Sequence, residues 1–201
     1  MTVLAFDLGG VLFTDGTAEF AAHLHDDHGV DLAQARHLLT GPLGSAYRRG
    51  ELTRDAFWHA FRQALGLSVP ADELAARWID GYRLDSGTRD LIRQLSRHHG
   101  VYYLSDNVAE RVDAVERRHR FLGLFTGGVF SHEAGVRKPD PRIYQVLLDR
   151  TGVEARHVVY IDDKDWALVP AAALGMTTIL FRGSGHLRRE LVRLGLLPGD
   201  Q

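Results

Sequence analysis

Short runs of apolar residues recur along the chain and stop at polar side chains or turns. Four of them have the length and composition of buried strands, at residues 3–6, 101–104, 158–161 and 177–181. A shorter apolar run covers residues 128–130. Helical spacing of apolar side chains predicts the intervening helices, which we place at residues 87–98, 108–119, from 140 onward and around 187–194. This alternation predicts an α/β fold, a Rossmann-like parallel sheet with helices on both faces.

The segment after the first strand breaks this alternation. Residues 17–84 contain only helical patterns, which we place at residues 17–28, 31–40, 53–65 and 71–82. Capping residues and glycines delimit most of these helices. We therefore predict two domains, an α/β core of residues 1–16 and 85–201 and a small all-helical insert of residues 17–84. The aromatic residues of the insert, Phe57, Trp58 and Phe61, recur at helical spacing, which is typical of a core.

Composition excludes several classes of protein. The formal net charge is -2, so no general basic field would attract nucleic acid or a membrane surface. No apolar run approaches the ~18 residues of a membrane span, and Asp7 interrupts the N-terminal apolar run, which argues against a signal peptide. The absence of cysteine excludes disulfides and thiolate chemistry. We expect a cytoplasmic monomer or homodimer without nucleic-acid or membrane partners.

Polar residues follow three of the predicted strands directly. Asp7 comes after the first strand, Ser105 after the second, and Asp162 and Asp163 after the strand at 158–161. Each alone fits an ordinary turn or helix cap. Because parallel strands end at one edge of a sheet, these side chains converge on one crevice. Lys138 is one of only two lysines among 24 basic residues, which suggests a need for a compact charge that arginine does not provide.

Four ordered segments carry a family resemblance. They are residues 6–12 (FDLGGVL), 104–105 (LS), 135–140 (GVRKPD), and 161–163 (IDD) with 173–176 (ALGM). They are similar to the motifs of the haloacid dehalogenase-like (HAD-like) hydrolase superfamily, and the match spans nearly the whole chain. The insert, with residues 49–53 (RGELT), resembles the helical cap of the subgroup that contains small sugar-phosphate phosphatases and the phosphatase domain of epoxide hydrolase.

The resemblance implies a phosphatase that uses Mg²⁺ and forms an aspartyl-phosphate. Asp7 would be the nucleophile, and Lys138 would neutralise both the nucleophile and the phosphate. The implied phosphate-binding residues are Ser105, Asp106, Asn107, Gly10 and Lys138. The implied metal ligands are Asp7, the carbonyl of Gly9, Asp163 and Asp162. Electrostatics independently favours a cation, because carboxylates about 4 Å apart repel by roughly 4 kcal/mol at an effective dielectric constant near 20.

The sequence departs from the family pattern in three places. Many relatives have a second aspartate two residues after the nucleophile as the acid for the leaving group, whereas this chain has Gly9. Asp15 is a possible replacement, although we favour a turn role for it. A substrate with a good leaving group, such as a sugar 1-phosphate, would also compensate. This hypothesis fails if alkyl phosphates are cleaved as fast as sugar 1-phosphates.

The second departure is Asp106, where the family usually has asparagine. We expect Asp106 to offer its backbone N–H while its side chain turns away, and Asn107 to supply the amide. The third is Ala167, where many relatives have asparagine, with Pro170 expected in the first turn of the following helix.

Three functions remain open. We favour a Mg²⁺-dependent phosphatase acting on a small phosphorylated metabolite, most simply a sugar phosphate. A hydrolytic 2-haloacid dehalogenase also uses an aspartate nucleophile and lacks the second aspartate, but it has no need for the Asp162–Asp163 pair. A non-catalytic protein that binds a phosphorylated ligand is the third option. Arg48 and Arg49 could contact a substrate, although we favour a solvated surface for both.

Overall fold

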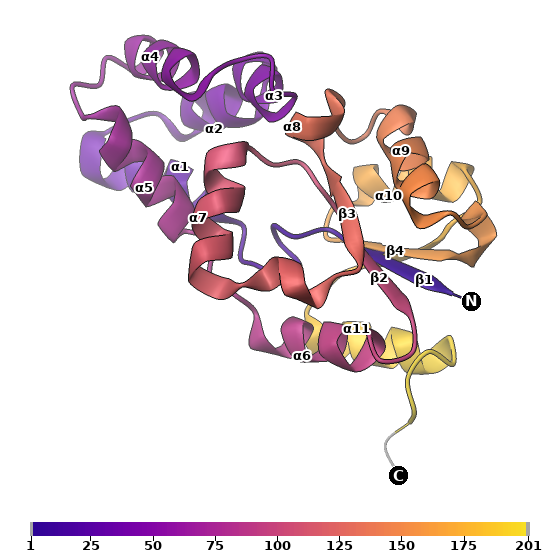
Figure 1. Cartoon of the computed structure of the whole chain (residues 1–201). Coiled ribbons are helices and arrows are strands. Elements are labelled where there is room, and N and C mark those ends of the chain that lie inside the picture. The colour runs from indigo at the N-terminus through magenta and orange to yellow at the C-terminus, as the bar shows by residue number, and fades with distance from the viewer. Residues whose placement is uncertain (1, 200–201) are drawn as a thin grey trace.

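A five-stranded sheet forms the centre of the structure, a computed structural model that describes residues 2–199 (Figure 1). The strand order is β3-β2-β1-β4-β5, and every pair is parallel. The strands are β1 (Val3–Phe6), β2 (Gly100–Ser105), β3 (Gly127–Phe130), β4 (Val158–Asp162) and β5 (Thr177–Leu180). The predicted parallel sheet is confirmed, and the short run at 128–130 belongs to an edge strand.

Helices cover both faces of this sheet and form the insert. The helices of the insert are α1 (Gly16–His28), α2 (Leu32–Thr40), α3 (Pro42–Arg48), α4 (Arg54–Leu65) and α5 (Ala71–Asp80). The remaining helices are α6 (Ser86–Leu95), α7 (Ala109–His119), α8 (Ser131–Ala134), α9 (Pro141–Thr151), α10 (Asp165–Ala173) and α11 (Ser184–Arg193). Two 3₁₀ turns, η1 (Phe121–Leu124) and η2 (Ala155–His157), precede β3 and β4.

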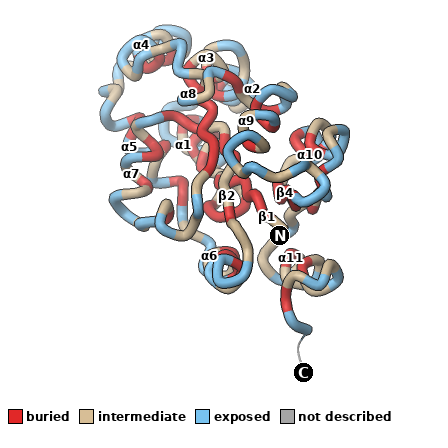
Figure 2. The backbone as a smooth tube through the Cα atoms, turned by 45° about the vertical axis from the view of Figure 1, so that its right-hand side comes forward, coloured by how far each residue is buried: buried red, intermediate tan, exposed pale blue. Residues whose placement is uncertain are grey.

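The continuous apolar character of the strands follows from burial on both faces. In β1, Leu4 and Phe6 pack into the core that contains residues of α6 and α11, whereas Ala5 packs into the core that contains residues of α9 and α10. Figure 1 shows α6 and α11 on one side of the sheet and α9 and α10 on the other. Figure 2 shows buried residues both along the strands and on parts of the surrounding helices.

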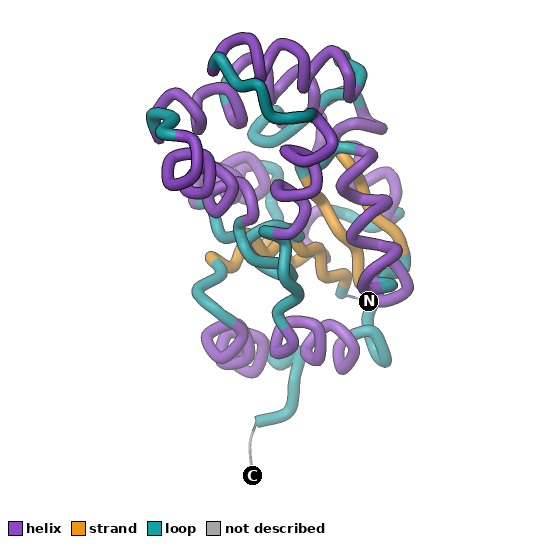
Figure 3. The backbone as a smooth tube through the Cα atoms, turned by 90° about the vertical axis from the view of Figure 1, so that its left-hand side faces the viewer, coloured by secondary structure: helices purple, strands orange, loops and turns teal. Residues whose placement is uncertain are grey.

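The insert lies between β1 and β2 in the chain and forms a separate group of helices at one end of the molecule (Figures 1 and 3). Its centre is a set of edge-on and stacked aromatic rings, namely Phe20, Phe57, Trp58, Phe61 and Trp78. The helical insert is confirmed. The exact domain limits, residues 1–16 and 85–201 against 17–84, stay a prediction.

Two helices were not predicted. The short helix α3 begins at Pro42 and contains Gly44, two residues that normally indicate a turn. Proline is well tolerated at the first helical position. A side chain at Gly44 would overlap the backbone of Leu39, so glycine lets α2 and α3 approach closely. The other is α8, a single turn after β3.

One local expectation is wrong. Pro170 lies in the second turn of α10, because this helix begins at Asp165. It therefore removes a backbone N–H that would otherwise donate within the helix. Within residues 2–199, no helix is long and apolar enough to cross a membrane.

Candidate active site

The polar strand ends meet in space. Asp7 follows β1, Ser105 ends β2 and Asp162 ends β4, and these three strands are neighbours in the sheet. Their side chains therefore share one edge. A cavity of about 340 Å³ opens there, and its wall combines residues of this edge with residues of the insert. The insert and the strand edge thus enclose a single site.

Asp7 is held by backbone contacts of the first strand and its loop. Its N–H donates to the carbonyl of Ile161 on β4 at 2.8 Å, so sheet pairing continues to the residue itself. The loop then closes on itself, because the N–H groups of Leu12 and Phe13 both donate to the carbonyl of Leu8. This tight loop fixes the carboxylate of Asp7 at the sheet edge.

Lys138 bridges two carboxylates. Its Nζ lies 3.0 Å from Oδ1 of Asp7 and 2.7 Å from Oδ2 of Asp162, and all three side chains are buried. Burial by itself lowers the pKa of Lys138, but Asp162 and Asp7 outweigh it and raise the pKa well above its usual value. The lysine is therefore a permanent positive charge beside Asp7.

The acid cluster, which we define as Asp7, Asp162 and Asp163, is rich in negative charge. One carboxylate oxygen from each lies within 4.8 Å of the others. Burial raises the pKa of Asp7 to about 8; Lys138 opposes this shift, and Asp162 and Asp163 add to it. The cluster therefore disfavours ionised Asp7 unless further positive charge is supplied.

The two acids after β4 have different partners. Oδ2 of Asp162 accepts from Lys138 Nζ and from the hydroxyl of Tyr160 at 2.5 Å, and Oδ1 accepts from the N–H of Lys164 at 2.8 Å. Oδ2 of Asp163 pairs with Lys164 Nζ at 2.7 Å, whereas Oδ1 is buried and has no hydrogen-bond partner. Asp163 thus holds an unused carboxylate oxygen, and Asp162 does not.

Gly10 lets Asp163 approach the loop. Its φ of +89° lies in the region that favours glycine. A side chain at this position would also overlap the carboxylate of Asp163. Two separate constraints therefore require glycine at residue 10.

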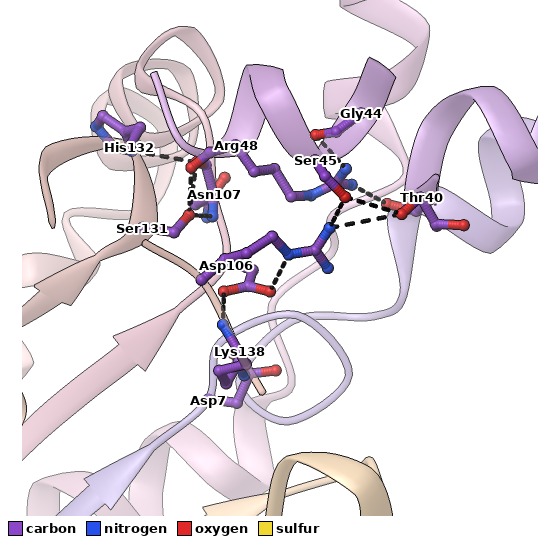
Figure 4. Close-up of polar contacts among 12 residues, drawn as sticks. Asp7, Thr40, Gly44, Ser45, Arg48, Asp106, Asn107, Ser131, His132 and Lys138 are labelled. Atoms are coloured by element: carbon purple, nitrogen blue, oxygen red, sulfur yellow. Dashed lines mark hydrogen bonds and ion pairs between the residues drawn. The ribbon is translucent and has the colours of Figure 1, made fainter. Parts of the chain in front are cut away.

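Asp106 is paired with the segment that carries Lys138 (Figure 4). Its Oδ2 accepts from Arg137 Nε at 2.9 Å and its Oδ1 accepts from the N–H of Lys138 at 3.0 Å. The side chain is therefore neutralised and positions the lysine. The expected contribution of its backbone N–H to phosphate binding stays a prediction.

Ser105 and Asn107 both line the cavity. The Ser105 hydroxyl makes no hydrogen bond to the part of the chain that the structure describes. Oδ1 of Asn107 accepts from the N–H of Val108 at 3.0 Å and from Arg111 Nε at 2.6 Å. These bonds fix the orientation of the amide and leave its NH₂ group as a donor.

Asp15 lines the cavity and caps helix α1. Its Oδ1 accepts from the N–H of Ala18 at the start of α1, and its Oδ2 pairs with Lys164 Nζ at 3.3 Å. Both oxygens accept from donors. This arrangement supports the turn role expected for Asp15.

Several residues of the cavity wall were missed or misjudged. Arg48 is buried and lines the cavity, so the expected solvated surface is wrong for it, whereas Arg49 forms a partly exposed ion pair with Glu51. Arg111 and Tyr82 also line the cavity. Helical periodicity could have identified Arg111 as facing inward beside Val112 and Val115, but no sequence signal marks Tyr82.

The parallel sheet, the helical insert and the acid cluster are those expected of a HAD-like hydrolase. The model of the haloacid dehalogenase-like hydrolases matches residues 1–175, and the chain belongs to this family. It is 29% identical over 193 residues to a sesquiterpene phosphatase of Aspergillus oryzae, a match that covers 94% of both chains.

Two further relatives agree with the predicted resemblance. The chain is 42% identical over 89 residues to bifunctional epoxide hydrolase 2 of Sus scrofa, a match covering 44% of this chain and 16% of that protein. A crystal structure of a HAD family enzyme from Bacteroides thetaiotaomicron, in complex with magnesium and inorganic phosphate, superposes with a TM-score of 0.73. It is 21% identical, and the match covers 89% of this chain and 93% of that one.

Proposed function

We propose that this hydrolase is a Mg²⁺-dependent phosphatase that cleaves a small phosphorylated metabolite through an aspartyl-phosphate. One observation supports it most strongly. Oδ1 of Asp163 is buried without a partner, beside a second carboxylate that burial and its neighbours keep from ionising readily. A cation between Asp7 and Asp163 would satisfy both groups.

The donor set fits magnesium. The candidate ligand atoms are all oxygens, and Mg²⁺ prefers oxygen ligands and keeps several waters. Asp7 and Asp163 would hold the ion through their carboxylates and Gly9 through its carbonyl, while Asp162 would hold Lys138 and the backbone of Lys164 in place. Bound there, the ion would screen the negative charge of Asp7 from an incoming phosphate.

The chain's own residues then perform the transfer. The carboxylate of Asp7 attacks phosphorus, and the bond from phosphorus to the leaving oxygen breaks. Lys138 keeps its charge throughout and stabilises the oxygens that become more negative. The Ser105 hydroxyl and the Asn107 NH₂ group donate to the phosphate. Water then hydrolyses the aspartyl-phosphate and regenerates Asp7.

The cavity limits the size of the substrate. Its volume of about 340 Å³ lies at the small end of ligand pockets. A sugar phosphate fits this volume and the polar wall. The relatedness to a sesquiterpene phosphatase makes an isoprenoid phosphate the second class to test, since Trp166 and Ala18 add apolar surface to the wall.

A screen of phosphorylated metabolites with and without Mg²⁺ tests this function. We expect phosphate release from at least one compound, dependence on Mg²⁺, and complete loss in Asp7→Asn. The matched control is Asp90→Asn, which removes an exposed carboxylate of α6 outside the cavity. Phosphate release that persists in Asp7→Asn would contradict the proposal.

The dehalogenase remains the second candidate because Gly9 lacks a side-chain acid. It predicts halide release from a 2-haloacid that continues in the presence of EDTA. A non-catalytic role predicts phosphate binding without turnover of p-nitrophenyl phosphate. The same set of assays therefore separates the three functions.

A further inference from the structure

The space beside Gly9 is occupied by a residue from the end of the insert. A Cβ atom built on Gly9 would lie 3.3 Å from Cε1 of Tyr82. Tyr82 follows α5, is buried, and lines the cavity. A phenol ring therefore lies where the side chain of residue 9 would begin.

The donors around Thr17 favour one direction for the hydrogen bond between Thr17 and Tyr82. Indole and guanidinium N–H groups can only donate. Oγ1 of Thr17 lies 3.3 Å from Trp78 Nε1 and 3.4 Å from Arg48 Nη2, so both of its lone pairs accept. Its own hydrogen is then left for the oxygen of Tyr82, which lies 2.9 Å away.

The oxygen of Tyr82 also receives a second donor. Arg111 Nη1 donates to it at 2.7 Å. When Thr17 donates, as assigned above, the phenol oxygen keeps its own hydrogen, and the hydrogen bonds within residues 2–199 then include no other acceptor for it. Tyr82 lines the cavity, and a catalytic role requires this hydrogen to reach a ligand bound there.

Two arginine side chains lie close to Tyr82. The guanidinium of Arg111 lies 4.5 Å from the centre of the Tyr82 ring and 4.3 Å from that of Trp78. Arg111 and Arg48 are both more than nine-tenths buried, and neither pairs with a carboxylate within the described part of the chain. Two buried guanidinium groups therefore lie close to this part of the cavity wall.

From this geometry we propose that Tyr82 is the catalytic proton donor to the leaving group, in place of the acid that is absent at Gly9. The proposal rests on the phosphatase function proposed above. Arg111 and Arg48 are positioning residues: Arg111 donates to the hydroxyl directly, and Arg48 donates to Thr17, which contacts it.

The proton balance closes over the two steps. When Asp7 attacks phosphorus, the electron pair of the breaking bond goes to the leaving oxygen, which takes the proton of Tyr82. The alcohol leaves and Tyr82 is a phenolate. In the second step, water gives a proton to this phenolate as its oxygen bonds to phosphorus, and the electron pair of the breaking bond returns to the Asp7 carboxylate.

The test compares leaving groups in Tyr82→Phe. An alkyl phosphate such as glycerol 2-phosphate needs a proton on its leaving oxygen, whereas p-nitrophenyl phosphate does not. We expect kcat for the alkyl phosphate to fall about 100-fold or more, with p-nitrophenyl phosphate changed by less than about threefold. Tyr103→Phe is the control, because it removes a half-buried phenol hydroxyl of β2 outside the cavity and should change neither rate.

Other results overturn the proposal in distinguishable ways. Equal losses with both substrates in a folded variant would assign Tyr82 a structural role, and no loss would exclude it. If wild-type protein cleaves only p-nitrophenyl phosphate, it has no effective proton donor. If it cleaves neither substrate with Mg²⁺, the phosphatase function itself fails.

A measurement on the wild-type protein avoids dependence on the variant's folding. The solvent deuterium isotope effect on kcat should be larger for the alkyl phosphate than for p-nitrophenyl phosphate. Equal effects would show that no proton moves with the leaving group, which contradicts the role of Tyr82.

Discussion

At the scale of single residues, Asp162 and Asp163 show how neighbouring side chains of one type acquire different roles. Asp162 uses both carboxylate oxygens for Lys138, Tyr160 and the backbone of Lys164. Asp163 keeps one buried oxygen without a partner. Asp162 is therefore suited to positioning Lys138 and the backbone of Lys164, and Asp163 to binding a cation.

The substitutions Asp163→Asn and Asp162→Asn should therefore affect different properties, the first Mg²⁺ binding and the second stability. We expect Asp163→Asn to weaken Mg²⁺ binding at least ~10-fold, by analogy with the loss seen when groups supporting a metal are removed, and to leave stability nearly unchanged. Asp162→Asn leaves the buried Lys138 with one carboxylate and should cost about 3 kcal/mol of unfolding free energy. Calorimetric Mg²⁺ titration and urea unfolding measure the two effects. Equal Mg²⁺ affinities in the two variants would contradict these roles.

The stability of the metal-free protein should depend on Asp7. Its pKa rises from 3.8 to about 8 on folding, so the folded state binds the extra proton between these values. The stabilising contribution is complete below pH 3.8 and is lost as the pH rises through 8. Burial also raises the pKa of Asp163, which adds in the same direction.

We therefore expect the melting temperature in EDTA to fall between about pH 4 and about pH 8. The fall should be smaller in Asp7→Asn, since this variant has no carboxylate to ionise at that position. Mg²⁺ should reduce the fall in wild-type protein by stabilising the ionised carboxylates. Identical pH profiles for the wild type and Asp7→Asn would contradict the assignment.

At the scale of elements, the loop after β1 determines the geometry of the acid cluster. Gly10 allows a positive φ and the close approach of Asp163. Gly66, at the end of α4, also has a positive φ, but nothing lies within 4 Å of a Cβ built on it. A comparison of alanine substitutions at these two glycines therefore distinguishes the effect of backbone strain from the effect of steric overlap with Asp163.

The Gly10→Ala variant should accordingly lose both stability and Mg²⁺ binding, whereas Gly66→Ala should lose only stability. Each should lose about 1–2 kcal/mol of stability from the left-handed backbone. Gly10→Ala should in addition displace Asp163 and greatly weaken Mg²⁺ binding, whereas Gly66→Ala should bind Mg²⁺ normally. Thermal unfolding and Mg²⁺ titration of both variants test this. Normal Mg²⁺ binding by Gly10→Ala would mean that the loop can adjust.

The same scale shows which elements the sequence could predict. Long amphipathic helices and buried strands were located because their periodicity is strong. Helix α3 was missed because Pro42 and Gly44 resemble turn residues, although tertiary contact with α2 accounts for the glycine. The place of Pro170 was misjudged because α10 begins at Asp165, directly after Lys164, whose N–H donates to Asp162.

At the scale of the whole molecule, one hydrophobic core connects the insert with the sheet. The same cluster of buried side chains contains Trp58 and Trp78 of the insert and Phe6 of β1. Both tryptophans are almost fully buried, whereas Trp166, at the cavity, is half exposed. A shared core favours cooperative unfolding.

We therefore expect the insert and the sheet to unfold together. Tryptophan fluorescence, which reports largely on the insert, and far-ultraviolet circular dichroism should give the same midpoint in urea. Phe61→Ala should lower both midpoints by a common amount, equivalent to about 3–5 kcal/mol. Separate transitions would show that the insert is an independent folding unit.

The sequence by itself determined the alternation of strands and helices, the helical insert, and the polar residues at the strand ends, because apolar periodicity and the order of segments along the chain are local properties. It also indicated Asp7, Lys138 and the acid pair as candidates. Only the tertiary structure decided that Asp163 has the unused oxygen, that Arg48 faces inward, and that Tyr82 lies beside Gly9. Each of these facts depends on which groups lie next to a side chain in space. Contacts between segments far apart in the chain determine this.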